Sequence, residues 1–199
     1  MEVTRTQWRT AVRAVADDLS TPRPLTFPPV VGLKELSRMF GVKENTPYQW
    51  HSKEILIAQS GTVSNNPVWK VPAIYAWAAA TKRVVVWHPW PVPTEDTDAS
   101  VPTGTPLRAG LRAVVDDLLA PGPLTVPPVV GLKEIGRMFD VKDNTPYQWR
   151  SKAKLAGEDG SISNNPVYKV PTIRAWAEAT GRVIVWDPWT GQLAESTPV

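Results

Sequence analysis

Two short segments of this chain carry side chains of the kind that read nucleic-acid bases. Each segment contains the run Asn-Thr-Pro-Tyr-Gln-Trp, at residues 45–50 and again at residues 144–149. Amide, phenol and guanidinium groups can hydrogen-bond to base edges in a DNA groove, and a lysine can contact a phosphate. The chemistry that these residues suggest is recognition of double-stranded DNA.

The candidate DNA-binding residues come from these two segments and from a hairpin predicted after each of them. In the first copy they are Lys43, Asn45, Thr46, Tyr48, Gln49, His51, Ser52, Lys53, Asn65, Asn66 and Lys70. In the second copy they are Lys142, Asn144, Thr145, Tyr147, Gln148, Arg150, Ser151, Lys152, Asn164, Asn165 and Lys169. The lysines could form an ordinary charged face. Their position in a predicted DNA-contacting helix and in the hairpin after it favours a role at DNA instead.

Metal chemistry is poorly represented in the sequence. The chain has no cysteine, and its only histidines are His51 and His88. Their counterparts in the second copy are Arg150 and Asp187, so neither histidine is preserved. With one histidine per site and no carboxylate cluster, we predict no metal site and no cofactor.

Catalysis is also not indicated. Adjacent carboxylates occur twice, at Asp17-Asp18 and at Asp116-Asp117. An acid–base pair needs a cleft and a perturbed environment, whereas these pairs end helices that we expect to be exposed. We therefore interpret both pairs as solvated helix ends. The sequence also lacks a Ser/His/Asp arrangement and a glycine-rich phosphate loop, and we predict no catalytic residue and no enzyme.

The chain is a repeat of one unit of about half its length. Residues 12–90 align without a gap onto residues 111–189 at an offset of 99, and 53 of the 79 positions are identical. A period near 100 residues suits whole domains, because solenoid repeats run to about 20–50 residues. The sequence therefore predicts a tandem duplication, each copy burying its own core.

The predicted domains are residues 1–90 and 107–190, joined by a linker at 91–106 and followed by a disordered tail at 191–199. The linker is rich in Pro, Thr, Asp and Gly and poor in large apolar side chains. Such a composition predicts a flexible tether. Because a flexible tether fixes no geometry, direct and inverted DNA half-sites both stay open.

Hydrophobic spacing supplies the elements that would position the reading residues. A first helix is predicted from apolar residues that recur every three to four positions, Trp8, Val12, Val15 and Leu19. A second helix, 32–40, has its apolar stripe at Leu33, Leu36, Met39 and Phe40. A tight turn at 41–44 then leads into the third helix.

The third helix is predicted to start with Thr46 as N-cap and Pro47 in the first helical position. Trp50 then lies on the same inward face as Pro47. That leaves Tyr48, Gln49, His51 and Ser52 on the outer face, where they could enter a groove. Two helices joined by a short turn, the second outwardly polar, are typical of a helix-turn-helix.

The rest of each copy predicts a hairpin wing, a fourth helix and a final strand. The wing has strands at 62–64 and 68–71 around an Asn-Asn-Pro turn. The fourth helix starts at Pro72, with Ile74, Trp77 and Ala78 on its inward face. The last strand is predicted over 83–90, and over 182–189 in the second copy. The fold class is therefore α+β, mainly α: two tandem winged helix-turn-helix domains, each with a small hairpin wing and a C-terminal strand.

Tryptophan is unusually frequent, with ten in the chain. Most are expected on inward faces as core: Trp50, Trp77, Trp87, Trp149, Trp176 and Trp186. Trp90 and Trp189, each beside a proline, could cap the core or form an exposed contact. The second option suggests a protein partner, or self-association, through the tryptophan-rich C-terminal strands.

The run GLKEIGRMFDVKDNTPYQWRSK…SNNPVYKVPTIRAWAEATGR, residues 131–182, resembles the MerR- and excisionase-type winged helix-turn-helix modules. Two departures are Pro47 and Pro146, where the family usually has Val or Ile, and a Ser-Asn-Asn-Pro wing tip in place of a basic one. Proline fits that helix position, whereas the changed tip argues against phosphate binding by the tip of the wing. The resemblance implies a transcriptional regulator, an excisionase or a partition protein.

The chain has a net charge of +3 and a sequence pI of about 9.2, which permits a nucleic-acid partner without requiring one. No apolar run approaches the ~18 residues of a membrane helix, so we expect no membrane partner and a cytoplasmic, nucleoid-associated location. The leading hypothesis is a sequence-specific double-stranded DNA-binding protein that reads two related half-sites. The alternative is a protein-interaction adaptor that uses the same fold as a scaffold.

Overall fold

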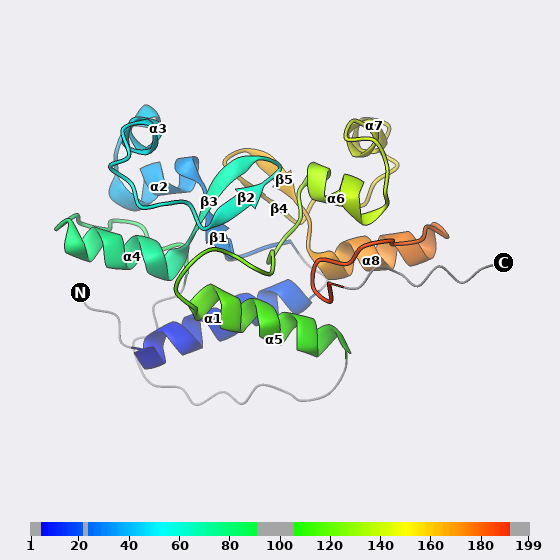
Figure 1. Ribbon diagram of the computed structural model, residues 1–199, viewed down its shortest axis with the longest axis horizontal. Helices are drawn as coiled ribbons and strands as arrows, with labels where there is room; N and C mark the ends of the chain where they lie inside the picture. Colours follow the sequence, from blue (N-terminus) through cyan, green and yellow to red (C-terminus); the bar gives the residue numbers. More distant parts are fainter. Residues whose placement is uncertain (1–4, 22–23, 91–105, 192–199) are drawn as a thin grey trace.

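The computed structural model describes residues 5–21, 24–90 and 106–191, and it is an α+β fold dominated by helices (Figure 1). Among these residues are eight helices and two small antiparallel sheets. The predicted linker, apart from its last residue, and the predicted tail, apart from Gly191, lie outside the described residues. Pro106, expected to end the linker, is instead the first residue of a helix.

The first half of the molecule, residues 5–90, contains seven elements. In chain order they are α1 (Arg5–Ser20), β1 (Val30–Val31), α2 (Leu33–Phe40), α3 (Asn45–Ser52), β2 (Gly61–Val63), β3 (Asn66–Lys70) and α4 (Val71–Ala80). The three strands form one sheet in the order β1-β3-β2, with Val31 opposite Trp69 and Thr62 opposite Pro67.

The second half, residues 106–191, repeats this order without a second β1. Its elements are α5 (Pro106–Leu119), α6 (Leu132–Met138), α7 (Thr145–Ser151), β4 (Gly160–Ile162), β5 (Asn165–Val167) and α8 (Val170–Ala179). In place of β1 it has a single bridge between Val130 and Tyr168.

The apolar patterns of the second and fourth helices are confirmed. The predicted stripe of α2 is buried along its whole length, and the helix ends where Gly41 takes a left-handed conformation, with φ 60°. In α4 the predicted inward residues Ile74, Trp77 and Ala78 are all buried. Local periodicity therefore determines which side of each helix meets the core.

The hairpin is present, but its turn is one residue earlier than predicted. Ser64 and Asn65 are the two turn residues, both with positive φ (47° and 66°), and Val63 pairs with Asn66. A two-residue hairpin turn of this kind needs positive φ at both central positions. The second half repeats the turn at Ser163 and Asn164, so Pro67 and Pro166 lie in strands.

The start of α3 also differs from the prediction. Thr46 is the second residue of the helix rather than its N-cap, and the cap position is occupied by Glu44, which is already helical (φ −51°, ψ −36°). The amide of Thr46 donates to the carbonyl of Lys43 at 2.8 Å, which continues the preceding turn into the helix. In the second half the cap is Asn144, and neither cap makes a side-chain hydrogen bond.

The predicted C-terminal strand is wrong: no strand element forms over 83–90 or 182–189. The segment instead crosses the end of α2, where the amides of Val86 and Trp87 both donate to the carbonyl of Met39, at 2.7 and 3.3 Å. A β-branched sequence forms a strand only when a neighbouring edge offers a ladder of partners, and here one helix end offers a single carbonyl.

Trp90 and Trp189 are buried within the molecule. Their indole nitrogens donate to the carbonyls of Pro28 (2.7 Å) and Pro127 (3.0 Å), and the rings are 2% and 5% exposed. Of the two options for these tryptophans, capping the core is the one that the structure shows, because neither ring is exposed.

The two halves share one hydrophobic core rather than burying two separate ones. Helices α1 and α5 lie side by side along one edge of the molecule (Figure 1). A single cluster of buried residues includes Val15 and Leu19 of α1 and Val114 and Leu118 of α5, and extends through both halves. The proline-containing segments after these helices also cross over, because Leu25 donates to Asp159 (2.6 Å) and Leu124 to Ser60 (2.5 Å) through backbone groups.

The hairpin turn of each half caps the second helix of the other. Gly32, at the N-cap of α2, has no side chain to offer, and the hydroxyl of Ser163 accepts the hydrogen bond from the Lys34 amide at 3.1 Å. Glu35 accepts from the Gly32 amide at 3.0 Å and from the Ser163 amide at 3.0 Å. The start of α2 is thus completed by the opposite half.

The same contacts recur in the other direction. Ser64 donates its amide to Glu134 at 3.0 Å and accepts from the Lys133 amide at 3.4 Å, while the Gly131 amide donates to Glu134 at 2.9 Å. When residue i of one unit contacts residue j of the other and j contacts i, the units are related by an approximate two-fold axis. The halves therefore have a defined mutual orientation.

Replacing Gly32 with alanine is expected to destabilise the protein by about 1–3 kcal/mol, because a Cβ there would overlap the Ser163 hydroxyl. Urea unfolding of the full chain would measure this loss. The double variant Gly32→Ala/Ser163→Gly should recover much of it, since φ at Ser163 is 47° and suits glycine. A double variant no more stable than Gly32→Ala would contradict the proposed overlap.

Candidate nucleic-acid interface

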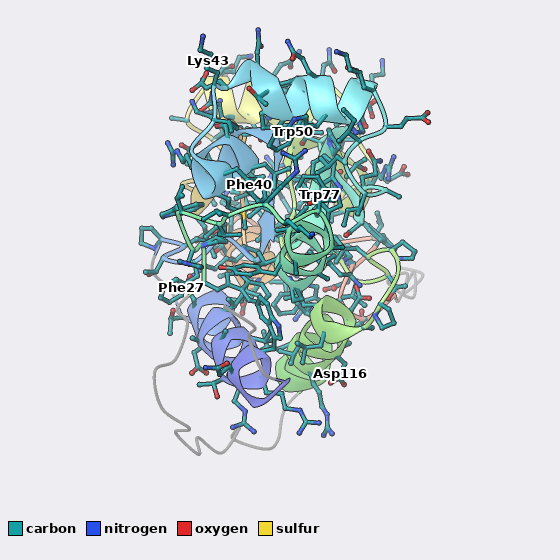
Figure 2. The ribbon with its side chains drawn as sticks, turned by 90° about the vertical axis from the view of Figure 1, so that its left-hand side faces the viewer. Phe27, Phe40, Lys43, Trp50, Trp77 and Asp116 are labelled. Carbon is teal, nitrogen blue, oxygen red and sulfur yellow. The ribbon has the colours of Figure 1, made fainter. Side chains whose placement is uncertain are left out.

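Helices α3 and α7 lie along the same edge of the molecule, opposite the edge formed by α1 and α5 (Figure 1). The perpendicular view agrees, with Lys43 at the α3 edge and Asp116 at the opposite end (Figure 2). A single flat or cylindrical partner could therefore meet both helices at once.

An aromatic cluster fixes the rotation of α3 about its own axis. Trp50 is 9% exposed and packs edge-on against Phe40, with ring centroids 5.7 Å apart. It also packs against Trp77 in a tilted arrangement, with centroids 5.7 Å apart. The guanidinium of Arg83 covers Trp50 at 4.2 Å from its ring centroid, a cation–π contact. With Trp50 held inward, the opposite face of the helix must point away from the core.

The second half builds the same cluster. Trp149 lies 5.9 Å from Phe139 and 5.5 Å from Trp176, and Arg182 lies over it at 4.3 Å. Trp149 is half-buried, so the inward position expected for it is confirmed with a looser fit than at Trp50.

The predicted outer face is exposed in both helices. Tyr48 is 51% exposed and Tyr147 is 45% exposed, high values for large aromatic side chains. The other exposed candidates are Lys43, Asn45, Gln49, His51, Ser52, Lys53, Lys142, Asn144, Gln148, Arg150, Ser151 and Lys152. Thr46 and Thr145 are half-buried.

Lys70 and Lys169 were expected at DNA, and this expectation is wrong. The two side chains are 2% and 1% exposed. Lys70 Nζ donates to the carbonyls of Asp117 (2.5 Å), Ala120 (3.2 Å) and Pro123 (3.2 Å) at the end of α5. Lys169 Nζ donates to the carbonyls of Asp18 and Thr21 at the end of α1. Each lysine caps a helix of the opposite half and is out of reach of a phosphate.

The paired carboxylates need a related correction. Asp17 and Asp116 are exposed as expected, but Asp18 and Asp117 are buried. Asp18 Oδ2 accepts from the amides of Thr26 (2.7 Å) and Phe27 (3.0 Å), which ties the segment after α1 back to the helix. Asp117 does the same for Thr125 and Val126, and its Oδ1 lies 3.2 Å from Lys70 Nζ. These contacts give the buried carboxylates a structural role.

The hairpin tips are engaged at the junction between the halves. Asn66 Nδ2 donates to the carbonyl of Ser64 at 3.1 Å, and Asn165 Nδ2 donates to that of Ser163 at 3.0 Å, so both amides serve their own turns. Asn65 and Asn164 are exposed, and Asn164 Oδ1 accepts from Lys34 Nζ at 2.9 Å. Of the wing residues predicted at DNA, the structure leaves these two on the surface.

Two charged residues near α7 were missed by the sequence prediction. Lys154 is exposed just after the helix, and Glu158 forms an ion pair with Arg150 at 2.9 Å. The sequence did hold a signal for both residues, because the first copy has uncharged Ile55 and Gln59 at the equivalent positions. The ion pair itself, however, joins residues eight positions apart across an irregular segment, and hydrophobic periodicity does not predict such a contact.

The described residues contain no group of three or more His, Cys, Asp or Glu side chains that could hold a metal ion. Among the same residues, no helix is both long and apolar enough to cross a membrane. Comparison with family models, with curated proteins and with solved structures found no match to this chain.

Proposed function

We propose that this protein binds double-stranded DNA in a sequence-specific manner, with α3 and α7 as the recognition helices of two helix-turn-helix units. One observation carries the proposal: two equivalent helices with exposed polar outer faces lie along the same edge of one body. In helix-turn-helix proteins the second helix enters the major groove and its outer residues contact base edges.

The side chains on this edge suit both parts of DNA recognition. Gln49 and Gln148 can bond the N6 and N7 atoms of adenine, and Arg150 can bond guanine. Lys53 and Lys152, at the ends of the same helices, can contact phosphates and so set the register of the protein on the duplex. All five side chains are exposed.

The approximate two-fold relation of the halves supports inverted half-sites. A pair of recognition helices related by a two-fold axis matches a DNA site whose half-sites are related in the same way. Adjacent major grooves on one face of the duplex are about 34–36 Å apart, which is the spacing that we expect for this site. Direct repeats, which a flexible tether would have allowed, are disfavoured by a shared core.

The experiment is selection of duplexes from a random library by the full chain, followed by fluorescence anisotropy at several salt concentrations. We expect one consensus with two inverted, related half-sites and a log–log salt slope near −5 to −7, as expected for about six to eight phosphate contacts. A steep slope without a consensus would indicate an architectural binder. Absence of duplex binding would contradict the proposal and favour the protein-interaction adaptor.

Removing both glutamine amides tests the reading face directly. Gln49→Ala/Gln148→Ala should weaken binding to the selected site by about 5- to 150-fold for each lost base contact, with little change on random DNA. Arg112→Ala is the matched control, because Arg112 is an exposed residue of α5, on the opposite edge of the molecule. The control should lose less than about 2-fold, and an equal loss in both variants would contradict base reading by α3 and α7.

A further inference from the structure

The two recognition helices carry the same outer residues except at one position. Tyr, Gln, Ser and Lys recur at equivalent places, whereas His51 in α3 corresponds to Arg150 in α7. Two further positions differ between the halves: Glu158, which pairs with Arg150, corresponds to Gln59, and Tyr168 corresponds to Trp69, which packs against His51. Within the helices themselves, the reading faces therefore differ only at His51 and Arg150.

In the second half Glu158 positions Arg150. Its Nη2 donates to Glu158 Oε2 at 2.9 Å, and the two side chains are 50% and 48% exposed, so the pair is at the surface. Tyr168, 1% exposed, lies beneath it. Burial raises the pKa of the Tyr168 phenol, whereas the charge of Arg150 and its hydrogen bond act in the opposite direction. Glu158 thus holds one edge of the Arg150 guanidinium.

In the first half the equivalent residues make no ion pair of this kind. His51 packs edge-on against Trp69, with ring centroids 5.6 Å apart, and Gln59 is exposed and uncharged. A neutral imidazole offers one donor and one acceptor, whereas a guanidinium offers a planar fork of donors. The two positions therefore cannot make the same contact with a base pair.

We propose that His51 and Arg150 read different base pairs, so that the half-sites differ at one position and the protein binds its site in one orientation. This inference rests on the proposed function. Arg150 selects G·C through the guanidinium donors that Glu158 leaves free, since paired donors match guanine O6 and N7. Glu158 is a positioning residue: it holds the guanidinium plane without touching the base.

The test is library selection with the full chain, wild type against Arg150→His/Glu158→Gln, which gives the second half the residues of the first at these two positions and leaves buried Tyr168 in place. The wild type should select half-sites that differ at one position, with guanine in one of them. The variant should select two matching half-sites without that guanine. Thermal unfolding of both proteins would confirm that the variant is folded.

Glu158→Gln separates positioning from charge. In the wild type we expect guanine to be preferred at that position by about 5- to 150-fold, and Glu158→Gln should reduce this preference. The affinity for random DNA should stay unchanged, or rise because a negative charge is lost. Glu178→Gln, at an exposed position on α8, makes the same charge change away from Arg150 and should leave the discrimination unchanged. A purely structural role for Glu158 would lower the melting temperature and leave base preference unaltered.

The outcomes distinguish this inference from the proposed function. A wild-type consensus with two identical half-sites would overturn the inference and leave DNA binding intact. An asymmetric consensus that survives in Arg150→His/Glu158→Gln would also overturn it, because the asymmetry would then come from other residues. No duplex binding by the wild type would overturn both.

Discussion

Replacing Lys70 with methionine should lower the free energy of unfolding by about 3–5 kcal/mol, the range seen when one partner of a buried charge pair is removed. The ammonium is 2% exposed and donates to three carbonyls at the end of α5, and it also lies 3.2 Å from a carboxylate oxygen of Asp117. Methionine keeps the volume of the side chain but leaves these acceptors buried without their donor. Urea denaturation of the full chain, followed by tryptophan fluorescence, would measure the change.

Two companion variants complete this experiment. Lys169→Met should behave like Lys70→Met, because Lys169 makes the reciprocal contacts at the end of α1. Lys154→Met is the control at an exposed position and should change stability by less than about 0.5 kcal/mol. An unfolding midpoint for Lys70→Met equal to that of the control would show that the buried lysine does not join the halves as the contacts indicate.

A change in half-site spacing should reduce DNA affinity by about 10²- to 10⁴-fold, the range by which engagement of a second linked site commonly raises affinity. Because one core and the reciprocal caps at Gly32 and Gly131 fix the halves, α3 and α7 cannot follow half-sites that move apart. Insertion of five base pairs moves one half-site to the other face of the duplex, and insertion of ten moves it a full turn away.

The ten-base-pair insertion is the informative one. Two flexibly tethered domains would recover much of their affinity there, since both half-sites return to the same face. A rigid pair should bind both insertions as weakly as a site with one half-site destroyed, which is the control duplex. Anisotropy titrations of the four duplexes would measure this, and recovery at ten base pairs would contradict the fixed arrangement.

The sequence by itself determined the local elements and the direction that their side chains face. The apolar stripe at Leu33, Leu36 and Met39 gave the second helix, and Trp50 on the inward face placed Tyr48 and Gln49 outward, as the structure has them. These predictions held because the side-chain period of a helix is a local property. The strand predicted from the β-branched run at 83–90 does not form. Strand formation depends on a partner edge, which the sequence pattern of one segment does not show.

Only the tertiary structure decided what covers each outward face. Lys70, Lys169, Asp18 and Asp117 are all buried, and each of the two lysines reaches the end of a helix in the opposite half. The repeat indicated two equivalent units and gave no sign that each completes the other's helix ends. Periodicity reports how a segment packs within its own unit, whereas the contact between units depends on complementary shapes and hydrogen-bonding groups far apart in the chain. For that reason α3 and α7 were predictable one at a time, and their fixed placement along a common edge was not.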